Sequence, residues 1–177
     1  MSQLKVDSIV PRGGLPSGAN GGVIQTVYAA FDSAFSTTST SGADTGLSAT
    51  INMQSSSNKL LINCSAAWCS TSNVTYLYLA DGSGNILQQP PARGSRGRYH
   101  WGTHYNGQTG NDDQFHLARE TFHCLHSPGA TGNFTVKLKM IITNSGHTGF
   151  LNRNSHDGDR INDPSAVSTL TLMEVSA

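Results

Sequence analysis

The sequence predicts an all-β protein, an antiparallel β-sandwich or jelly roll preceded by an extended N-terminal arm. Apolar residues alternate with polar ones in most of the apolar segments, and a period of two is typical of half-buried strands. Turn-forming residues separate these segments, and no segment has a convincing helical period. About nine short strands joined by such turns are characteristic of a sandwich or a jelly roll.

Residues 1–22 differ in composition from the rest of the chain. Two prolines and five glycines lie between Pro11 and Gly22, which excludes a regular element there. Asp7 and Ser8 interrupt the only apolar run, so a secretory signal is excluded as well. We expect an arm that docks on a neighbouring subunit or a larger assembly, and a loose terminal tail is the alternative. The expected docking residues are Leu4, Val6, Ile9 and Val10.

Residues 23–177 are long enough for one domain with its own core. Residues 23–31 are rich in β-branched and aromatic side chains and are the first expected strand. Residues 35–42 are too polar for a core, so we expect an edge strand or an exposed loop. Residues 46–53 alternate and predict a half-buried strand. Residues 59–69 are the most apolar candidate, and we expect this strand in the middle of a sheet.

The next segments continue the pattern. Residues 74–80 predict another strand, and residues 81–84 predict a tight turn, because Asp and Gly tolerate the backbone angles that such a turn requires. We expect residues 85–89 to return antiparallel to that strand. Residues 90–114 form the longest irregular stretch of the chain.

The last third of the chain supplies the remaining strands. Residues 115–126 are compatible with a helix or a strand, and we interpret them as a strand because β-favouring residues precede a Ser-Pro-Gly turn. Residues 133–143 alternate strongly, which confirms the β class for this region. Residues 149–152 and 167–175 are the final two strands, with a polar loop between them.

Composition excludes several classes of partner. Charged residues make up 12% of the 177 residues and the net charge is zero, so no basic footprint for nucleic acid is present. No apolar run approaches the ~20 residues that span a bilayer, so we expect a soluble protein without membrane insertion. The three cysteines show no paired spacing and are expected to be reduced, although one bridge to Cys124 is compatible with the sequence.

Tests for chemistry favour neither a metal nor an enzyme. The pair His100 and His104 would need a helix to converge on a metal, and no paired-cysteine motif accompanies the other histidines. Residues 152–159 are oxygen-rich, but their spacing differs from a calcium loop, so a turn with self-bonding Asx side chains is the better interpretation. No G-x-S-x-G elbow is present and glutamates are scarce. We therefore expect no catalytic residues, no metal and no cofactor.

The irregular segment 90–114 is the expected contact surface. Recognition residues commonly lie on loops that a rigid scaffold holds in place, and this loop concentrates basic and aromatic side chains. The candidate surface-recognition residues are Arg93, Arg96, Arg98, Tyr99, Trp101, His104 and Tyr105.

Several ordered stretches resemble small virion proteins of tailed phages that infect marine bacteria and cyanobacteria. They are LKVDSIVP, FSTTSTSGADTGLSATI, SSNKLLI, GSRGR, LHSPGATGNFTVKLKM and LNRNSHDGDRINDPSAVSTLTLMEV. The resemblance covers nearly the whole chain and carries over no catalytic residue. It implies an N-terminal attachment segment followed by a β-sandwich, in a tail fibre-like or capsid-surface protein.

The resemblance and the residues together predict a structural virion protein that assembles in the host cytoplasm. We expect a homotrimer that binds tail or capsid subunits, with the segment around residues 93–105 as a distal surface for a host glycan. A capsid decoration protein is the first alternative, in which the aromatic residues would be buried between subunits. A free carbohydrate-binding module is the second alternative, although such a module would not need the arm.

Overall fold

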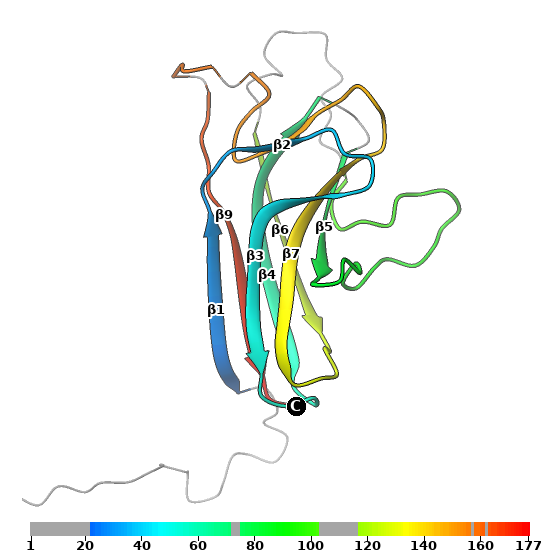
Figure 1. Ribbon diagram of the computed structural model, residues 1–177, viewed down its shortest axis with the longest axis vertical. Helices are drawn as coiled ribbons and strands as arrows, with labels where there is room; N and C mark the ends of the chain where they lie inside the picture. The colour runs from blue at the N-terminus through cyan, green and yellow to red at the C-terminus, as the bar shows by residue number, and fades with distance from the viewer. Residues whose placement is uncertain (1–21, 72–74, 103–116, 157, 162) are drawn as a thin grey trace, which may run out of the picture.

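Two antiparallel sheets pack face to face in the computed structural model, which describes residues 22–71, 75–102, 117–156, 158–161 and 163–177 (Figure 1). The predicted sandwich is confirmed, and no helix occurs among the described residues. The strands are β1 (Val23–Phe31), β2 (Phe35–Thr37), β3 (Ala43–Met53), β4 (Lys59–Ser70), β5 (Thr75–Asp81), β6 (Ala118–His126), β7 (Gly132–Ile142), β8 (Gly149–Leu151) and β9 (Ser168–Val175).

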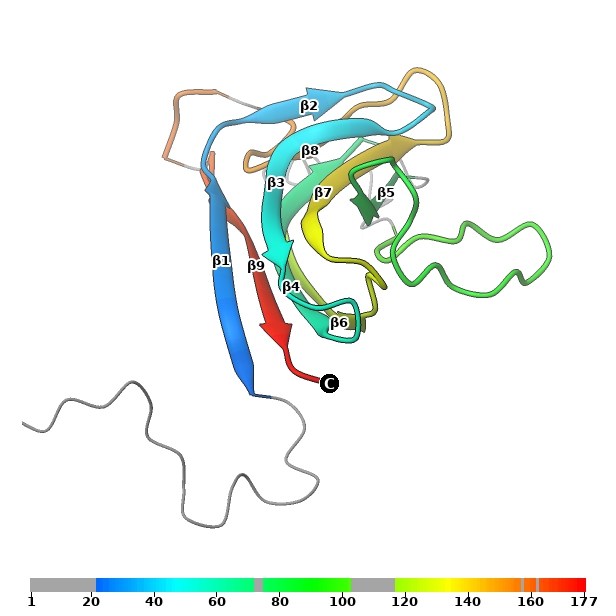
Figure 2. The ribbon, with the colours of Figure 1, turned by 60° about the horizontal axis from the view of Figure 1, so that its bottom comes forward.

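The larger sheet, sheet A, has β4 at its centre, as the sequence predicts. The strand order is β1-β9-β4-β8-β2, and β6 pairs with the other edge of β4. Strand β9 pairs with the first half of β4, and β8 pairs with the last residues of β4. Strands β9 and β8 therefore lie end to end beside β4. Strand β1 pairs with β9 and strand β2 pairs with β8, so β1 and β2 form the edge of the sheet beyond them (Figure 2). Sheet B contains only β3, β7 and β5, with β7 in the middle.

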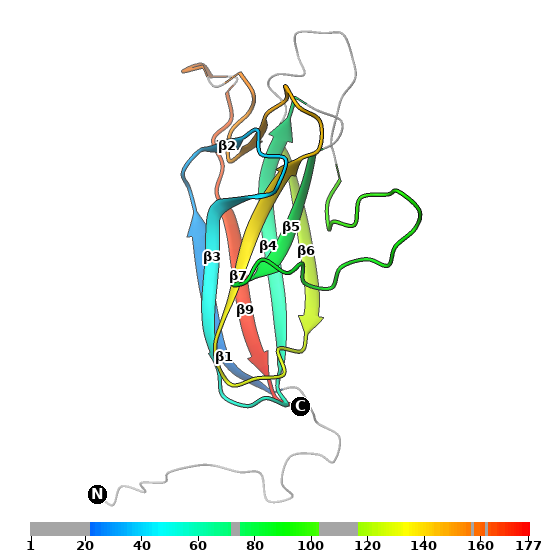
Figure 3. The same ribbon diagram turned by 45° about the vertical axis from the view of Figure 1, so that its right-hand side comes forward.

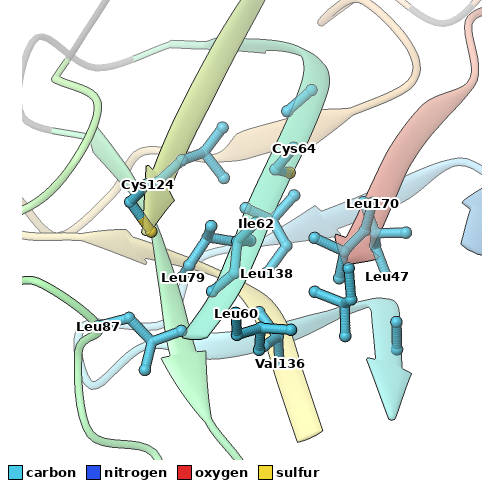
Figure 4. Packing of buried hydrophobic residues seen from close by; sticks show 14 of the residues in the cluster. Leu47, Leu60, Ile62, Cys64, Leu79, Leu87, Cys124, Val136, Leu138 and Leu170 are labelled. Atoms are coloured by element: carbon cyan, nitrogen blue, oxygen red, sulfur yellow. The ribbon is translucent and has the colours of Figure 1, made fainter. Parts of the chain in front are cut away.

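The core lies between the two sheets, and the alternation of the sequence determines which side chains enter it. In β3, Leu47 and Ile51 are buried whereas Ser48 and Thr50 are exposed. Figure 4 shows leucines from both sheets in contact across the interior. Each fully buried leucine or isoleucine contributes ~1.5–3 kcal/mol relative to an exposed one. The largest fully buried side chains are Trp68, Leu47, Ile51, Met53, Leu60, Ile62, Leu77, Leu79, Leu138, Met140, Ile142 and Leu151.

A buried carboxylate organises the end of the sandwich at which β1 begins and β9 ends. Glu174 accepts hydrogen bonds from Asn58 Nδ2 at 2.6 Å, Gln25 Nε2 at 2.5 Å and the Gln54 amide at 2.8 Å. Burial raises the pKa of Glu174, but these hydrogen bonds and that of the Ser55 amide outweigh it and hold the pKa below its usual value. The carboxylate therefore ties the β3–β4 turn to both β1 and β9.

Side-chain hydrogen bonds of Asn152 link the polar loop after β8 to the sandwich. Asn152 has a positive φ of 62°, and its side chain donates to the Phe31 carbonyl at 2.6 Å and accepts from Ser168 Oγ at 2.6 Å. Asn154 donates to Asp163 Oδ1 at 2.8 Å. The Asn152 amide therefore packs the loop on the sandwich, whereas the Asn154 amide bonds within the loop. No group of metal-ligating side chains occurs among the described residues.

Smaller expectations are refined by the structure. Residues 35–42 contain only the three-residue strand β2, at an edge of sheet A. Residues 85–89 return beside β5 with one isolated bridge, between Ala80 and Ile86, and do not form a strand. All three cysteines are buried and free, and burial raises the pKa of Cys64 to about 12. The described part of the chain contains no helix long and apolar enough to cross a membrane.

Candidate recognition surface

The candidate loop begins with a tight turn after β5. Asp81 Oδ1 accepts hydrogen bonds from the amides of Ser83 and Asn85, both at 2.9 Å, and Gly84 adopts a φ of 93°. Burial raises the pKa of Asp81, but these hydrogen bonds and the one from the Asn85 side chain lower it by more than burial raises it. The pKa of Asp81 therefore lies below its usual value. The carboxylate stabilises the turn, after which the chain runs antiparallel to β5 along the free edge of that strand.

The returning loop covers this free edge by hydrogen bonding. Leu77 exchanges both backbone hydrogen bonds with Trp101, at 3.2 and 3.1 Å, and the Leu87 amide donates to the Leu79 carbonyl at 3.0 Å. Between them, the Leu79 amide donates to His100 Nδ1 at 3.0 Å. Because Nδ1 accepts, the proton of neutral His100 is on Nε2, which donates to the Leu87 carbonyl at 2.6 Å. An edge strand that would otherwise be open is thereby protected.

Trp101 is a core residue, so its expected role as an exposed recognition side chain is wrong. Only 7% of it is exposed, and its ring meets Phe122 of β6 edge to face at 5.5 Å. His100 stacks on the same Phe122 at 4.1 Å, with an interplanar angle of 4°. The three rings close the open side between β5 of sheet B and β6 of sheet A. Trp101 is buried within its own subunit.

Tyrosines gather on the opposite side of β5, on the outer face of sheet B. Tyr99 of the loop stacks on Tyr76 at 4.7 Å and meets Tyr78 at 5.3 Å. Tyr76 and Tyr99 are half-buried and Tyr78 is buried. Burial, followed by the proximity of Tyr99 and Asp44, raises the pKa of Tyr78 above its usual value. Partly exposed phenol rings of this kind offer both an apolar edge and a hydrogen-bonding group to a ligand.

The three arginines lie on the projecting part of the loop. Arg93 and Arg96 are exposed, whereas Arg98 is half-buried and its Nε donates to the Pro90 carbonyl at 2.7 Å. That hydrogen bond closes the neck of the segment 90–98. Figures 1 and 3 show this green loop projecting from the side of the sandwich at mid-height. The described part of this loop lies beside sheet B.

The same face of sheet B carries an ion cluster at a bulge in β3. The pairing with β7 shifts between Asp44 and Ser48, and Thr45 Oγ1 inside the bulge donates to the Leu138 carbonyl at 2.9 Å. Asp44 lies 2.8 Å from Lys139 Nζ and 3.1 Å from Lys137 Nζ. The hydrogen bond from Lys139 is the largest influence on the pKa of Asp44, and together with Lys137 it lowers that pKa despite partial burial. A depression of about 210 Å³ lies at the bulge.

The structure thus brings together a different set of residues from the one that the sequence predicts. Arg93, Arg96 and Tyr99 remain at the surface. Tyr76 and Tyr78 were missed, although the alternation of residues 74–80 places them opposite Leu77 and Leu79. Asp44 at the bulge pairs with Lys139, which is also the cross-strand neighbour of Tyr78. This contact depends on strand register, so no local pattern in the sequence predicts it.

Part of the predicted site lies outside the described residues. This applies to His104 and Tyr105 of the loop and to all four docking residues: Leu4, Val6, Ile9 and Val10. No protein-family model matches the sequence, and no curated protein is similar enough to it to count as a match.

Proposed function

We propose that the chain is a structural virion protein of a tailed bacteriophage, a tail fibre-like or host-adsorption module that attaches to the particle through residues 1–22. The observation that carries the proposal is the division of the chain into two parts. The described core is built from strands between Val23 and Val175. The N-terminal segment has its own apolar residues and a Pro- and Gly-rich connection to that core.

The point of attachment is anchored to the sandwich. The Ser176 amide donates to the Gly22 carbonyl at 3.0 Å, so the chain enters β1 beside the end of β9. A partner that holds residues 1–21 would hold the body at this end. Sheet B and its loop would then remain accessible along the side of the body.

The chemistry of sheet B supports adsorption to a hydroxylated or anionic glycan. The guanidinium groups of Arg93 and Arg96 are exposed, and their planar donor pattern matches carboxylate and phosphate groups. Tyr76 and Tyr99 are half-buried on the outer face of sheet B and stack on one another. A free carbohydrate-binding module has less support, because Trp101 is buried and the tyrosines stack on one another.

The proposed partners are other virion proteins and further copies of the chain, in a homotrimer assembled in the host cytoplasm. A capsid decoration protein is the alternative that uses the same arm. Burial of Trp101 inside one subunit favours neither location, since it places that ring neither at an exposed tip nor between subunits.

Deletion of residues 1–22 tests the attachment. We expect the remaining body to keep its strand signal in circular dichroism and to be lost from purified particles, because the core is formed by later residues. A matched full-length variant in which Leu4, Val6, Ile9 and Val10 are replaced by serine separates apolar docking from chain length. Normal incorporation of both variants would contradict the docking arm.

The copy number of the chain per particle distinguishes the two locations. Quantitative mass spectrometry against the major capsid protein is expected to find only a small number of copies, as for a tail module. Roughly equal copies would instead identify a capsid decoration protein. Absence of the chain from purified particles would overturn the virion assignment.

A further inference from the structure

The outer face of sheet A has a row of three apolar side chains and one threonine that crosses four strands. The cross-strand register places Thr26, Met173, Leu61 and Leu125 side by side on β1, β9, β4 and β6. Their neighbours in each strand point into the core, so these four side chains face outward. Leu125 is 51% exposed. At the β6 edge of the row, Gln88 Nε2 donates to the Leu125 carbonyl.

The next row is polar and contains no Asp, Glu, Lys or Arg. Tyr28, Thr171, Asn63 and His123 are aligned across the same four strands, and Tyr28 is 63% exposed. Beyond them, Ala30, Thr169, Ser65 and Thr121 form a third row of small side chains. The middle of the face is therefore flat and offers hydroxyl and amide groups.

Charge is restricted to the two ends of this face. Lys59 donates to Ser127 Oγ at 2.9 Å, and Arg119 donates to Ser65 Oγ and to the Val167 carbonyl. No carboxylate faces outward from the described parts of these four strands. The outer face of sheet B differs, because Asp44, Lys137 and Lys139 lie in its middle. A scarcity of charged residues, together with Tyr and Met at the surface, is characteristic of the buried centre of a protein interface.

The area of the face identifies the kind of partner that fits. Four strands ~4.8 Å apart and about eight residues long present roughly 500 Å² in projection. That is the same order as the ~800 Å² of accessible surface that each partner contributes to a standard interface. A single extended segment such as residues 4–10 would cover only about a quarter of it, at ~23 Å by ~5 Å. A partner that covers the whole face must present a surface about as wide as the four strands, and a second copy of this chain has such a surface.

We propose that the outer face of sheet A is a self-association surface that binds a second copy of this chain. The inference goes beyond the proposed homotrimer, since it assigns one pairwise contact between two copies and fixes no copy number. It does not depend on particles, because the isolated chain is sufficient to test it.

The test is the mass of the full chain in solution, measured by light scattering after size exclusion. We expect a whole-number multiple of 18.7 kDa for the unaltered chain. Thr171→Asp and Tyr28→Asp place a charge at the middle of the face, and both are expected to run as monomers. Thr135→Asp is the matched control, because Thr135 is also half-buried on the outer face of a central strand, in sheet B. This variant is expected to keep the mass of the unaltered chain.

Three outcomes would overturn the proposal. One is a monomeric unaltered chain, and another is an oligomer that persists in both face variants with strand signal intact. The third is an oligomer that is lost when Leu4, Val6, Ile9 and Val10 are changed to serine but retained in Thr171→Asp, which would assign association to the arm. If a face variant unfolds, hydroxyl-radical labelling of the unaltered chain decides the question. Tyr28 and Met173 are expected to lose labelling as the chain is concentrated, whereas unchanged labelling would contradict the interface.

Discussion

Tyr99 and Trp101 show how two similar aromatic residues acquire different roles within three positions of a loop. Tyr99 lies outside sheet B against Tyr76, whereas Trp101 pairs with the backbone of Leu77 and its ring reaches Phe122 in the core. The loop has no strand periodicity that would indicate which ring is buried. The difference follows from the contact between β5 and the loop.

Substitution of Trp101 by alanine is expected to destabilise the fold. Removing a buried Trp leaves a cavity and costs ~3–5 kcal/mol in the free energy of unfolding. Urea unfolding measures this loss. Trp101→Phe retains most of the apolar contact and is expected to cost less, and exposed Arg96→Ala is expected to leave the urea midpoint unchanged. An unaltered midpoint for Trp101→Ala would contradict the core assignment.

At the scale of elements, the segment 82–101 acts as a cover for β5. It satisfies the outer edge of that strand with backbone and imidazole groups, and it places Tyr99 and Gly97 against Tyr76. A side chain at position 97 would have no room, because an added Cβ would lie 2.9 Å from Cζ of Tyr76. Position 102 is also next to Tyr76, but there the nearest ring atom would be at 3.7 Å, an ordinary contact distance.

Two alanine substitutions test this packing. Gly97→Ala is expected to displace the loop from Tyr76, with a cost on the order of 1 kcal/mol and a change in the near-ultraviolet dichroism of the tyrosines. Gly102→Ala is the control at the same ring and is expected to leave both measurements close to those of the unaltered chain. Equal effects of the two changes would show that the Gly97 contact is not specific.

At the scale of the whole molecule, the two sheets are joined on the β5–β6 side by a histidine. His100 binds the backbone of β5 and Leu87 through its two nitrogens and stacks on Phe122 of β6. Burial lowers the pKa of His100 below 6.5, although the bond to Leu87 opposes this shift. Burial likewise lowers the pKa of His126, against the opposing charge of Asp81. Protonation of His100 would also break its bond to the Leu79 amide.

Stability is therefore expected to fall as the solution becomes acidic. Below pH 6.5 the unfolded chain binds protons at these histidines that the folded chain does not bind, so acid favours unfolding. Urea midpoints at about pH 7.5 and about pH 5.5 measure the change. His100→Gln is expected to reduce the pH dependence, and the His126→Gln change in addition is expected to reduce it further. An undiminished pH dependence in the double variant would contradict the assignment to these histidines.

The fold class and most of the strands could be predicted from the sequence. Alternation in residues 46–53 and 133–143 is produced by the pleat of a strand with one face in the core, so it can be recognised without knowing the partner strand. The central position of β4 follows from its being the most apolar strand candidate, and the strand β6 follows from its β-favouring residues. The basic loop was also recognisable, because Arg93 and Arg96 have no apolar pattern to bury them.

Which residues form surfaces and which close the core depends on contacts between distant segments of the chain. Burial of Trp101 depends on the free edge of β5, and the ion cluster at Asp44 depends on a register shift against β7. The face of sheet A without outward-facing carboxylates depends on the order β1-β9-β4 with β6 beside it, which aligns rows from four distant segments. Local periodicity reports only whether a side chain alternates between two faces. Strand pairing determines what each face meets, because those contacts join residues far apart in the sequence.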